Sequence, residues 1–494
     1  MNAPSNAPGD APSDAPGNAP GDGMRPTLAL LAMLLAVLAA VAFGRIAPTA
    51  ATTARDESLA PAWLNDIETG ADHVDPEELA RALLAGDDVL VVDVRPADEF
   101  AGWHLPGAVN LSVPDVVGAP GAALLARAPA RVVLCSNGPA HPAQAWVELR
   151  RQGHANVFVL DGGLDAFFAR VLTPPSLRAG IDAASAKAAA ASWPLVRAFF
   201  LGGGSPRAAA SLWATDPATL TTPTMVSPAW LRARLQEVAV LDVRSAAEHA
   251  ALHVPGSVRL DLPSLRVRAG DREHFLRSDA ELAARFGALG LTADRPVVLV
   301  ADDKPHDATM AALALLRLGH RALAVLEGGV LRWAAERGPL TAAPTSIAAA
   351  TYAPRAVTED FTITADALEA GRKAGAMRVL DVRPPAAFRG ETSTEARPGH
   401  IPGARNRPLA ADQQRTGDGQ WLAPRAELAA TYAELMPRGG GDVAVSCRTG
   451  HAASHTFFLL RFLLGRDDVR WYAGSWTEWA ARADLPAETG AVKP

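Results

Sequence analysis

The stretch VLVVDVRPADEFAGWHLPGAVNL, residues 89–111, carries the pattern that decides the fold of this chain. A valine-rich apolar run ends in Asp-Val-Arg at residues 93–95, and a short segment compatible with a helix follows it. The His-Leu-Pro-Gly sequence at residues 104–107 has the proline and glycine of a turn, and a second apolar run comes after it. This order predicts a strand, a helix, a turn and a second strand.

The same pattern occurs twice more in the chain. Residues 238–260 read VAVLDVRSAAEHAALHVPGSVRL, and residues 377–388 read MRVLDVRPPAAF. After an insertion, the third copy resumes as RPGHIPGARNRPL at residues 397–409. A self-similar unit that recurs along one chain indicates structural copies of one domain.

Each copy also contains a second apolar run, which precedes a polar loop and an amphipathic segment. These runs are RVVLC at 131–135, PVVLV at 296–300 and DVAVSC at 442–447. A glycine lies 18 residues after Cys135 and after Cys447, and the same step back from Gly319 reaches Ala301. The residues that lie 26 positions after Cys135, Ala301 and Cys447 are Asp161, Glu327 and Ala473. The middle copy therefore lacks the cysteine of the other two, and we expect it to be non-catalytic.

Strands that alternate with helices predict an α/β fold, because parallel strands need crossover helices that cover the faces of the sheet. We expect three tandem domains of this kind, each a parallel sheet with helices on both faces. The linker at 173–223 is rich in Ala, Gly and Pro, and AASAKAAAASWPLVRAFF within it predicts an additional helix. The predicted domains cover residues 72–172, 224–340 and 358–486.

The N-terminal part of the sequence differs from the repeats. Residues 1–23 are a low-complexity tract without residues that could build a core, so we expect them to be disordered. Within residues 24–45, an uncharged apolar run of 18 residues at 27–44 lies between two arginines. This run predicts a signal peptide or a membrane anchor, and its length is compatible with both. In either case we expect the domains to be exported, to the periplasm or to the periplasmic side of a membrane that tethers them.

The composition argues against several classes of protein. The net charge of −6 leaves no excess of basic residues for a nucleic-acid partner. Only 2 of the 494 residues are cysteines, which rules out a disulfide framework and a C-x-x-C zinc site. The sequence also lacks the spacing of a phosphate-binding loop, so we expect no metal, nucleotide or other cofactor.

Cys447 stands in the sequence VAVSCRTGHAAS at residues 443–454. Binding and catalytic groups of open α/β sheets gather at the carboxyl ends of the strands, where this thiol is predicted to lie. Backbone amides of the loop and the start of the next helix would stabilise an anionic sulfur. Arg448 adds a positive charge and Gly450 permits a tight turn. The pattern predicts a reactive thiol, and the alternative is an inert buried cysteine.

The Asp-Val-Arg triplet, Gly-His-Ile-Pro-Gly-Ala, the Cys-Arg-x-Gly loop and WYAGSWTEW at 471–479 together resemble the rhodanese sulfurtransferase family. The resemblance extends over residues 72–486, and the layout is similar to three-domain members with an export segment. It implies that the third domain is catalytic and that Cys447 carries a persulfide. It further implies that Arg389, from the insertion, binds the acidic group of the sulfur donor. The six-residue loop CRTGHA would complete the binding site through Arg448, Thr449, Gly450, His451 and Ala452.

The resemblance implies sulfur transfer from thiosulfate, or secondly from 3-mercaptopyruvate, to cyanide, a small thiol or a protein acceptor. Thiosulfate-using members tend to have Cys-Arg-Lys-Gly, whereas mercaptopyruvate-using members have Cys-Gly-(Ser/Thr)-Gly. The loop here shares Arg448 with the first type and Thr449 with the second, so the donor is left open. The acidic residue that usually precedes Gly-Ser-Trp is Ala473 here. The alternative function is a non-catalytic persulfide carrier or a scaffold that binds a partner.

Other residues in the repeats have competing interpretations. Cys135 is either a secondary thiol or a structural residue, because Pro139 and Pro142 remove amide donors from its loop. The Asp-Val-Arg triplets and the histidines of the turns also occur in the copy without cysteine, so we expect them to support the fold. A cysteine phosphatase would need an arginine at the position of Ala453. The tryptophans at 471, 476 and 479 predict core packing.

Overall fold

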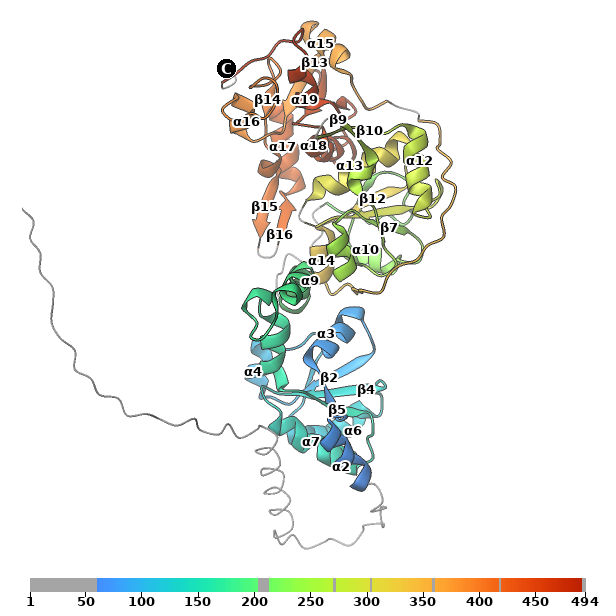
Figure 1. Cartoon of the computed structure of the whole chain (residues 1–494), viewed down its shortest axis with the longest axis vertical. Coiled ribbons are helices and arrows are strands. Elements are labelled where there is room, and N and C mark those ends of the chain that lie inside the picture. Colours follow the sequence, from blue (N-terminus) through green and yellow to red (C-terminus); the bar gives the residue numbers. More distant parts are fainter. Residues whose placement is uncertain are drawn as a thin grey trace, which may run out of the picture. The chain divides into compact units, whose positions relative to one another are not determined.

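The computed structural model describes residues 60–202, 213–269, 272–302, 304–357, 360–416 and 419–490. The chain divides into two units, Met1–Ala62 and Trp63–Pro494, and the second unit contains the elements that position the site (Figure 1). The predicted low-complexity tract and the predicted signal peptide or anchor lie outside the described residues. Within the described ranges, no helix combines the length and the apolar character that a membrane crossing requires.

The first copy forms a parallel five-stranded sheet in the order β1-β5-β4-β2-β3. Its strands are β1 (His73–Val74), β2 (Val89–Asp93), β3 (Val109–Asn110), β4 (Arg131–Cys135) and β5 (Val157–Leu160). Its helices are α2 (Ala60–Thr69), α3 (Pro76–Ala85), α4 (Ala97–Gly102), α5 (Val113–Val117), α6 (Ala119–Leu125), α7 (Ala140–Arg151) and α8 (Gly163–Phe167). A π-helix, Phe168–Leu172, and a 3-10 helix, Pro175–Leu177, lead to α9 (Ala183–Leu201). Helix α9 confirms the additional helix predicted in the linker.

The second copy repeats this sheet in the order β6-β12-β11-β7-β8. Its strands are β6 (Thr224–Val226), β7 (Ala239–Asp242), β8 (Val258–Arg259), β11 (Val297–Val300) and β12 (Leu323–Leu326). A separate hairpin consists of β9 (Arg266–Ala269) and β10 (Arg272–Leu276), and the 3-10 helix Leu262–Leu265 precedes it. The helices are α10 (Pro228–Ala233), α11 (Ala246–Ala251), α12 (Asp279–Ala288), α13 (Pro305–Arg317) and α14 (Gly329–Ala335).

The third copy has a parallel sheet in the order β14-β13-β17-β18. Its strands are β13 (Met377–Asp381), β14 (Arg405–Asn406), β17 (Asp442–Ser446) and β18 (Val469–Trp471), and a parallel bridge joins Thr362 to Trp471. A hairpin of β15 (Gln413–Thr416) and β16 (Gly419–Leu422) follows the 3-10 helix Leu409–Asp412. The helices are α15 (Ala365–Lys373), α16 (Pro385–Arg389), α17 (Arg425–Leu435), α18 (His451–Phe458), the π-helix Leu459–Leu463 and α19 (Ser475–Ala481). The repeated strand order confirms an α/β fold built from parallel sheets flanked by helices.

Each Asp-Val-Arg triplet forms a buried ion pair at the end of the matching strand. Arg95 pairs with Asp93 at 2.6 Å, and its guanidinium also donates to the carbonyl of Trp103 at 2.7 Å. The pairs Arg244–Asp242 and Arg383–Asp381 repeat this contact, with donation to the carbonyls of Leu252 and Gly399. In every copy, the accepting residue directly precedes the histidine of the Pro-Gly turn. The triplet therefore ties the strand end to the turn, which confirms its predicted structural role.

The second and third domains share a hydrophobic core. Helix α13 packs against α18 in this core, and Figure 1 shows the two helices side by side. Buried side chains of both helices, including Leu313 and Phe457, belong to one cluster. Thr309 Oγ1 and Ser454 Oγ, which lie 2.9 Å apart, form a hydrogen bond between the helices. Because α18 begins directly after the Cys447 loop, this packing fixes the loop against the second domain.

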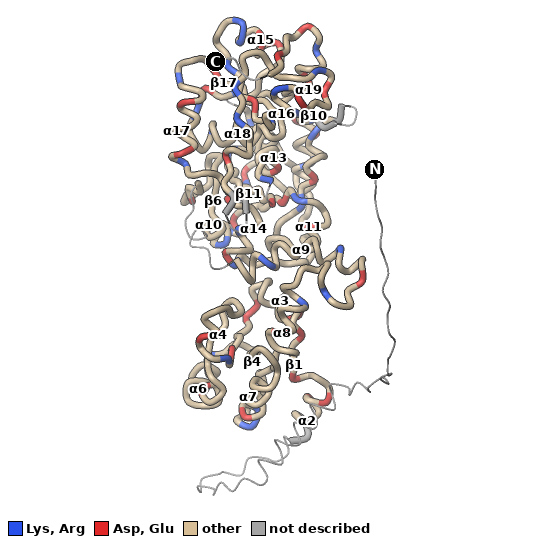
Figure 2. The backbone as a smooth tube through the Cα atoms, turned by 90° about the vertical axis from the view of Figure 1, so that its left-hand side faces the viewer, with Lys and Arg blue, Asp and Glu red and all other residues tan. Residues whose placement is uncertain are grey.

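Charged residues of both signs occur throughout the part of the chain that the structure describes. Figure 2 shows acidic and basic residues interspersed along the described backbone in that view. Many of them pair locally, as Arg277, which lies just before α12, does with Glu281 in the first turn of that helix at 2.8 Å. Such exposed pairs contribute little to stability, so the fold depends mainly on its buried core.

Candidate active site

A pocket of about 580 Å³ lies at the carboxyl ends of β13 and β17, where the sequence predicts the reactive thiol. Cys447 is the first residue after β17, and it lies on the pocket wall with 3% of its surface exposed. The polar residues of the wall include Lys304, His306, Arg383, Arg448, Thr449 and His451. The pocket therefore presents cationic and imidazole groups around one thiol.

The backbone of the Cys447 loop leaves its amides available to an anion. The carbonyls of Cys447, Arg448 and Gly450 accept hydrogen bonds from Trp476 N at 3.0 Å, Thr477 N at 2.9 Å and Trp471 Nε1 at 2.9 Å. By contrast, the amides of residues 448–452 form no hydrogen bond within the described part of the chain. Amides at the start of a helix stabilise negative charge, so the loop suits a thiolate or a persulfide.

The tryptophans around the loop are part of the core. Trp471 and Trp476 are 1% exposed and Trp479 is fully buried, which confirms the predicted packing. Trp476 also lies under the guanidinium of Arg383, 5.0 Å from its ring centre. The core thus supports both the loop and the pocket wall.

Gly450 is required by the shape of the loop. Its φ is 79°, and a Cβ atom there would lie 2.4 Å from the carbonyl oxygen of Ala473. A side chain does not fit at that distance, so glycine allows the loop to approach the segment after β18. This is the tight turn that the sequence predicts.

Ser475 occupies a strained position beside the thiol. Its φ is 50°, and the matching residues of the other copies are glycines, Gly163 at 65° and Gly329 at 59°. The hydroxyl oxygen of Ser475 accepts a hydrogen bond from the Cys447 amide at 3.0 Å and lies 4.0 Å from its Sγ. The hydroxyl donates to the carbonyl of Tyr472 at 2.8 Å. Strained backbone of this kind tends to occur at functional sites, and here it places the hydroxyl against the Cys447 amide.

Arg448 lines the pocket and also pairs with an acid of the insertion. Its Nε donates to Glu395 Oε1 at 2.7 Å. The arginine side chain is 50% exposed, whereas that of Glu395 is 6% exposed. Because the arginine remains half exposed, the pair does not bury its charge, and Glu395 competes for it with any anion in the pocket.

Arg389 lies outside the pocket lining. Its guanidinium forms two hydrogen bonds with Glu391, at 2.6 and 2.9 Å, and both side chains are exposed. Within the described chain, the residues that line the pocket around Cys447 do not include Arg389. Its role in donor binding stays a prediction.

The second domain contributes to the pocket although it has no cysteine. Lys304 and His306 line the pocket from the loop after β11 and the start of α13. This loop occupies the same place in the second domain as the Cys447 loop does in the third. The guanidinium of buried Arg266 also donates to the carbonyl of Thr449. The matching loops of two domains therefore meet at one site.

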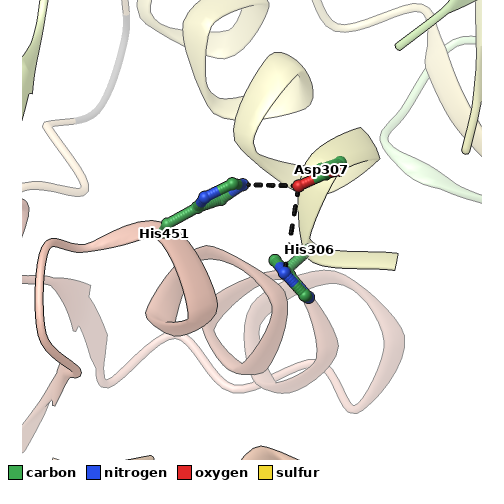
Figure 3. Close-up of side chains that lie close together, drawn as sticks. All are labelled: His306, Asp307 and His451. Carbon is green, nitrogen blue, oxygen red and sulfur yellow. Dashed lines mark ion pairs between the residues drawn. The ribbon is translucent and has the colours of Figure 1, made fainter. Parts of the chain in front are cut away.

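The structure brings most of the predicted loop residues together. Thr449, His451 and Ala452 line the pocket with Cys447 and Arg448. His451 Nε2 also lies 2.9 Å from Oδ1 of Asp307, a residue of the second domain (Figure 3). The loop thus contributes its side chains to the pocket and to the domain contact.

The matching site of the second domain is nearly filled. A cavity of about 40 Å³ remains at the end of β11, and its walls include Gly328, Gly329 and His455. His455 comes from the third domain and is buried, which lowers its pKa to about 3. A neutral imidazole of the third domain therefore forms part of the wall of the small cavity that remains at this position.

Cys135 lies in a different environment from Cys447. It ends β4 and is fully buried, and it is a free cysteine. Burial raises the pKa of its thiol well above the usual range, and the negative charge of Asp93 raises it further. A protonated, buried thiol is a poor nucleophile. This environment favours a structural role for Cys135, and its role as a secondary thiol stays a prediction.

Sequence reasoning missed several residues of the site. The sequence does contain a signal for Ser475: it lies 28 residues after Cys447, and the matching residues of the other copies are Gly163 and Gly329. The sequence contains no such signal for Glu395, because acidic residues are common in exposed insertions. The pocket residues of the second domain, Lys304 and His306, depend on the packing between domains, which spacing within one copy does not predict.

Comparisons with known proteins agree with this architecture. A family model described as Rhodanese-like domain matches residues 75–170, 227–336 and 364–482. A putative thiosulfate sulfurtransferase of Synechococcus elongatus is 33% identical over 291 residues, which cover 56% of this chain and 89% of that protein. The sulfur carrier protein TtuD of Thermus thermophilus is 32% identical over 282 residues, which cover 54% of this chain and 96% of that protein.

A solved structure extends the likeness in fold over most of the chain. The complex of hercynine with an EanB variant that has two cysteines replaced by alanine matches with a TM-score of 0.50, and the match covers 85% of this chain and 98% of that chain. The two sequences are 20% identical, so this likeness concerns the fold alone.

Proposed function

The chain belongs to the rhodanese-like domain family, and from this premise we propose that its third domain carries sulfur on Cys447 from a small donor to an acceptor. One observation carries the proposal. The thiol lies on a pocket wall beside Arg448, at a loop whose amides at 448–452 have no other partner in the described chain. This environment suits a group that alternates between thiolate and persulfide.

The reaction would be a double displacement. In the first step, the Cys447 thiolate attacks the outer sulfur of thiosulfate, the S–S bond of the donor breaks, and sulfite leaves with the bonding electrons. In the second step, cyanide or a thiolate attacks the outer sulfur of the persulfide. That S–S bond then breaks, and its electrons return to Cys447 as the thiolate. Sulfur moves in the same oxidation state throughout, so no external oxidant or reductant is needed.

The residues around the thiol have distinct roles in this mechanism. The free amides of the loop stabilise the anionic sulfur of both enzyme forms. Ser475 accepts a hydrogen bond from the amide of Cys447 and so fixes the thiol in the pocket. Arg448 and Lys304 supply positive charge for the sulfonate-like end of the donor.

Thiosulfate is our first choice of donor and 3-mercaptopyruvate the second. A small dianion suits a pocket with Arg448 and Lys304 on its walls. The name of the Synechococcus relative, a putative thiosulfate sulfurtransferase, supports the same choice. A carboxylate donor would use the same cations, which is why the second donor belongs in the test.

A second candidate function is persulfide transport without turnover of a small acceptor. It is favoured by the relative named sulfur carrier protein TtuD. A carrier would accept sulfur on Cys447 and release it only to a protein partner. The two functions therefore differ in the acceptor and not in the loading step.

Intact mass spectrometry of the full-length chain tests the proposal. The reduced protein is exposed briefly to thiosulfate, and separately to 3-mercaptopyruvate, and its mass is measured before and after addition of cyanide. We expect a gain of one sulfur atom that cyanide removes, and repeated turnover with release of thiocyanate. Loading without discharge by cyanide or small thiols would instead support the carrier.

Two cysteine variants serve as a matched pair in this experiment. Cys447→Ser should abolish the gain of sulfur, whereas Cys135→Ser should retain it. If the folded Cys447→Ser chain still gained sulfur, or if neither donor loaded the wild-type chain, the assignment of the reactive thiol would be wrong.

We also propose that the domains work outside the cytoplasm, because residues 24–45 contain the uncharged run at 27–44. Fractionation of cells that express the chain with a C-terminal tag tests this proposal. The tag should occur in the periplasmic or membrane fraction, and deletion of residues 24–45 should retain it in the cytoplasm. A cytoplasmic full-length chain would contradict export.

A further inference from the structure

Three metal-ligating side chains meet where the second and third domains pack together. His306 and Asp307 lie at the start of α13, and His451 is the first residue of α18. Figure 3 shows an ion-pair contact from each of the two imidazoles to the Asp307 carboxylate. One ligand atom from each of the three side chains lies within 4.8 Å of the other two.

The spacing of these atoms matches the ligand set of a transition-metal ion. Asp307 Oδ1 lies 2.9 Å from His451 Nε2 and 3.9 Å from His306 Nε2. Two ligands of a tetrahedral zinc ion, each about 2.0–2.1 Å from the metal, lie roughly 3.3 Å apart. The observed distances lie on both sides of this value, so small side-chain rotations would complete the geometry.

The charge balance also favours a cation. The ion-pair partners that Asp307 has in the described chain are the two histidines, and no lysine or arginine there pairs with it. Two neutral imidazoles and one carboxylate give the site a charge of −1. This set of two nitrogens and one oxygen is common to zinc and other divalent first-row ions.

The packing of the two domains holds the ligands in place. Ser454, which follows His451 by less than one helical turn, bonds to Thr309 on α13 at 2.9 Å. Helices α13 and α18 share one hydrophobic core, so their first turns have little freedom to separate. A site preorganised in this way loses little entropy when an ion binds.

The site is open on one side. The side chains of His306, His451 and Asp307 are 26%, 28% and 21% exposed. His306 and His451 also line the pocket of Cys447, whereas Asp307 does not. Three protein ligands with solvent access leave a coordination position for water or for a small anion in the pocket.

We propose that His306, Asp307 and His451 bind a divalent transition-metal ion, zinc being the ion to test, at the junction of the second and third domains. The bound ion would cross-link the domains and add positive charge to the pocket wall. The second domain, which lacks a cysteine, would then supply two of the three ligands. The proposal goes beyond sulfur transfer, since it holds whether or not Cys447 accepts sulfur.

Zinc titration of the full-length chain tests the site. The chain is first treated with a chelator and then titrated with zinc sulfate in competition with a chromophoric chelator. We expect one tightly bound equivalent, and Asp307→Asn and His451→Ala should each weaken binding by more than about 100-fold. His141→Ala, a change at an exposed histidine of the first domain, is the matched control and should bind zinc as the wild type does.

Thiols are the main competing ligands, so the titration is repeated in the Cys135→Ser/Cys447→Ser chain. Zinc should bind this chain with unchanged affinity, and Co²⁺ bound to the wild type should show no thiolate-to-cobalt charge-transfer band. Loss of binding in the cysteine-free chain would overturn the proposal and assign the metal to sulfur. Unchanged binding in Asp307→Asn and His451→Ala would overturn it as well.

Thermal unfolding shows whether a variant that does not bind zinc has lost only the metal site or has also lost its folded structure. Zinc at about 100-fold above its Kd should raise the Tm of the wild type by roughly 5 °C. Asp307→Asn, which keeps the size of the side chain, should have a Tm close to that of the metal-free wild type and should not respond to zinc. An equal zinc-dependent rise in this variant would contradict the assignment.

Discussion

Ser475 combines a strained backbone with a hydrogen bond to the amide of Cys447. The two other copies have glycine at this position, which is the residue that tolerates a positive φ at no cost. The third copy accepts the strain of a serine, and only this copy has a hydroxyl next to a thiol in the pocket. Backbone strain of this kind costs about 1–3 kcal/mol and tends to occur at functional sites.

Substitution of Ser475 should therefore separate stability from activity. Ser475→Gly relieves the strain but removes the acceptor for the Cys447 amide, so we expect its stability to stay within about 1 kcal/mol of the wild type. The rate of sulfur transfer should fall about tenfold, because the thiol loses its fixed position. Urea unfolding and the thiocyanate assay measure the two effects.

Ser475→Ala is the control for this substitution. It lacks the hydroxyl but keeps a Cβ at positive φ, so it should lose activity to the same extent and be about 1 kcal/mol less stable than Ser475→Gly. Equal stability of the two variants would show that the backbone at this position is not strained.

Glu395→Gln should strengthen donor binding. The substitution releases Arg448 from its ion pair and leaves its charge for the donor. A pair with one half-exposed partner contributes about 0.2–1 kcal/mol, so we expect the KM for the donor to fall by up to about fivefold at unchanged kcat. Steady-state kinetics at low and high salt measure this change.

Glu391→Gln is the matched control, because it releases Arg389 in the same manner. If Arg389 does not bind the donor, this variant should keep the wild-type KM. A fall in KM in Glu391→Gln, together with a rise in Arg389→Ala, would instead support the role of Arg389 that the sequence predicts.

The strand that ends in Asp-Val-Arg is the element that all three domains share. In each copy, a buried arginine joins the aspartate at the strand end to the carbonyl before the turn histidine. In the third copy, Arg383 also lines the pocket around Cys447. A substitution in the middle copy therefore measures only what the ion pair contributes to the stability of the fold.

Loss of the aspartate in the middle copy should destabilise the chain without a direct effect on chemistry. Asp242→Asn leaves the charge of Arg244 buried without its partner, so we expect a loss of about 3–5 kcal/mol. Asp381→Asn should cost a similar amount and also raise the KM, since it disturbs Arg383. Urea unfolding and donor kinetics distinguish the two variants, and an equal KM in both would contradict the role of Arg383 in the pocket.

For the molecule as a whole, the sequence patterns predicted the three repeated domains but not the contacts between them. The three copies, the Asp-Val-Arg strand ends, Gly450 and the helix Ala183–Leu201 follow from periodicity, turn chemistry and propensity, which act locally. Lys304 and His306 line the pocket because the second and third domains pack together. The spacing of residues within one copy does not predict contacts between copies. The position of Arg389 depends on the fold of an insertion, which has no counterpart in the other copies.

Acid should destabilise the whole molecule through its buried histidines. The pKa of His455 falls from 6.5 to about 3, and that of His320 falls to about 4, mainly because burial disfavours the charged form. Between these values and 6.5, the unfolded chain binds more protons than the folded chain, so stability is lost as pH falls through this window. Each histidine should contribute a slope of up to about 1.4 kcal/mol per pH unit.

His455→Leu tests this pH dependence. Neither ring nitrogen of His455 has a hydrogen-bond partner in the described chain, so an apolar side chain should be tolerated at neutral pH. The free energy of unfolding of the variant should fall less steeply than that of the wild type between pH 6.5 and 4. Equal slopes for the two chains would rule out His455 as a source of acid sensitivity.

The common core of α13 and α18 limits how this protein could be shortened or recombined. A fragment that begins after residue 357 would keep the thiol and its loop but would expose the apolar face of α18 to water. It would also lose Lys304 and His306 from the pocket. We therefore expect the third domain to need the copy without a cysteine for its stability and for a complete pocket.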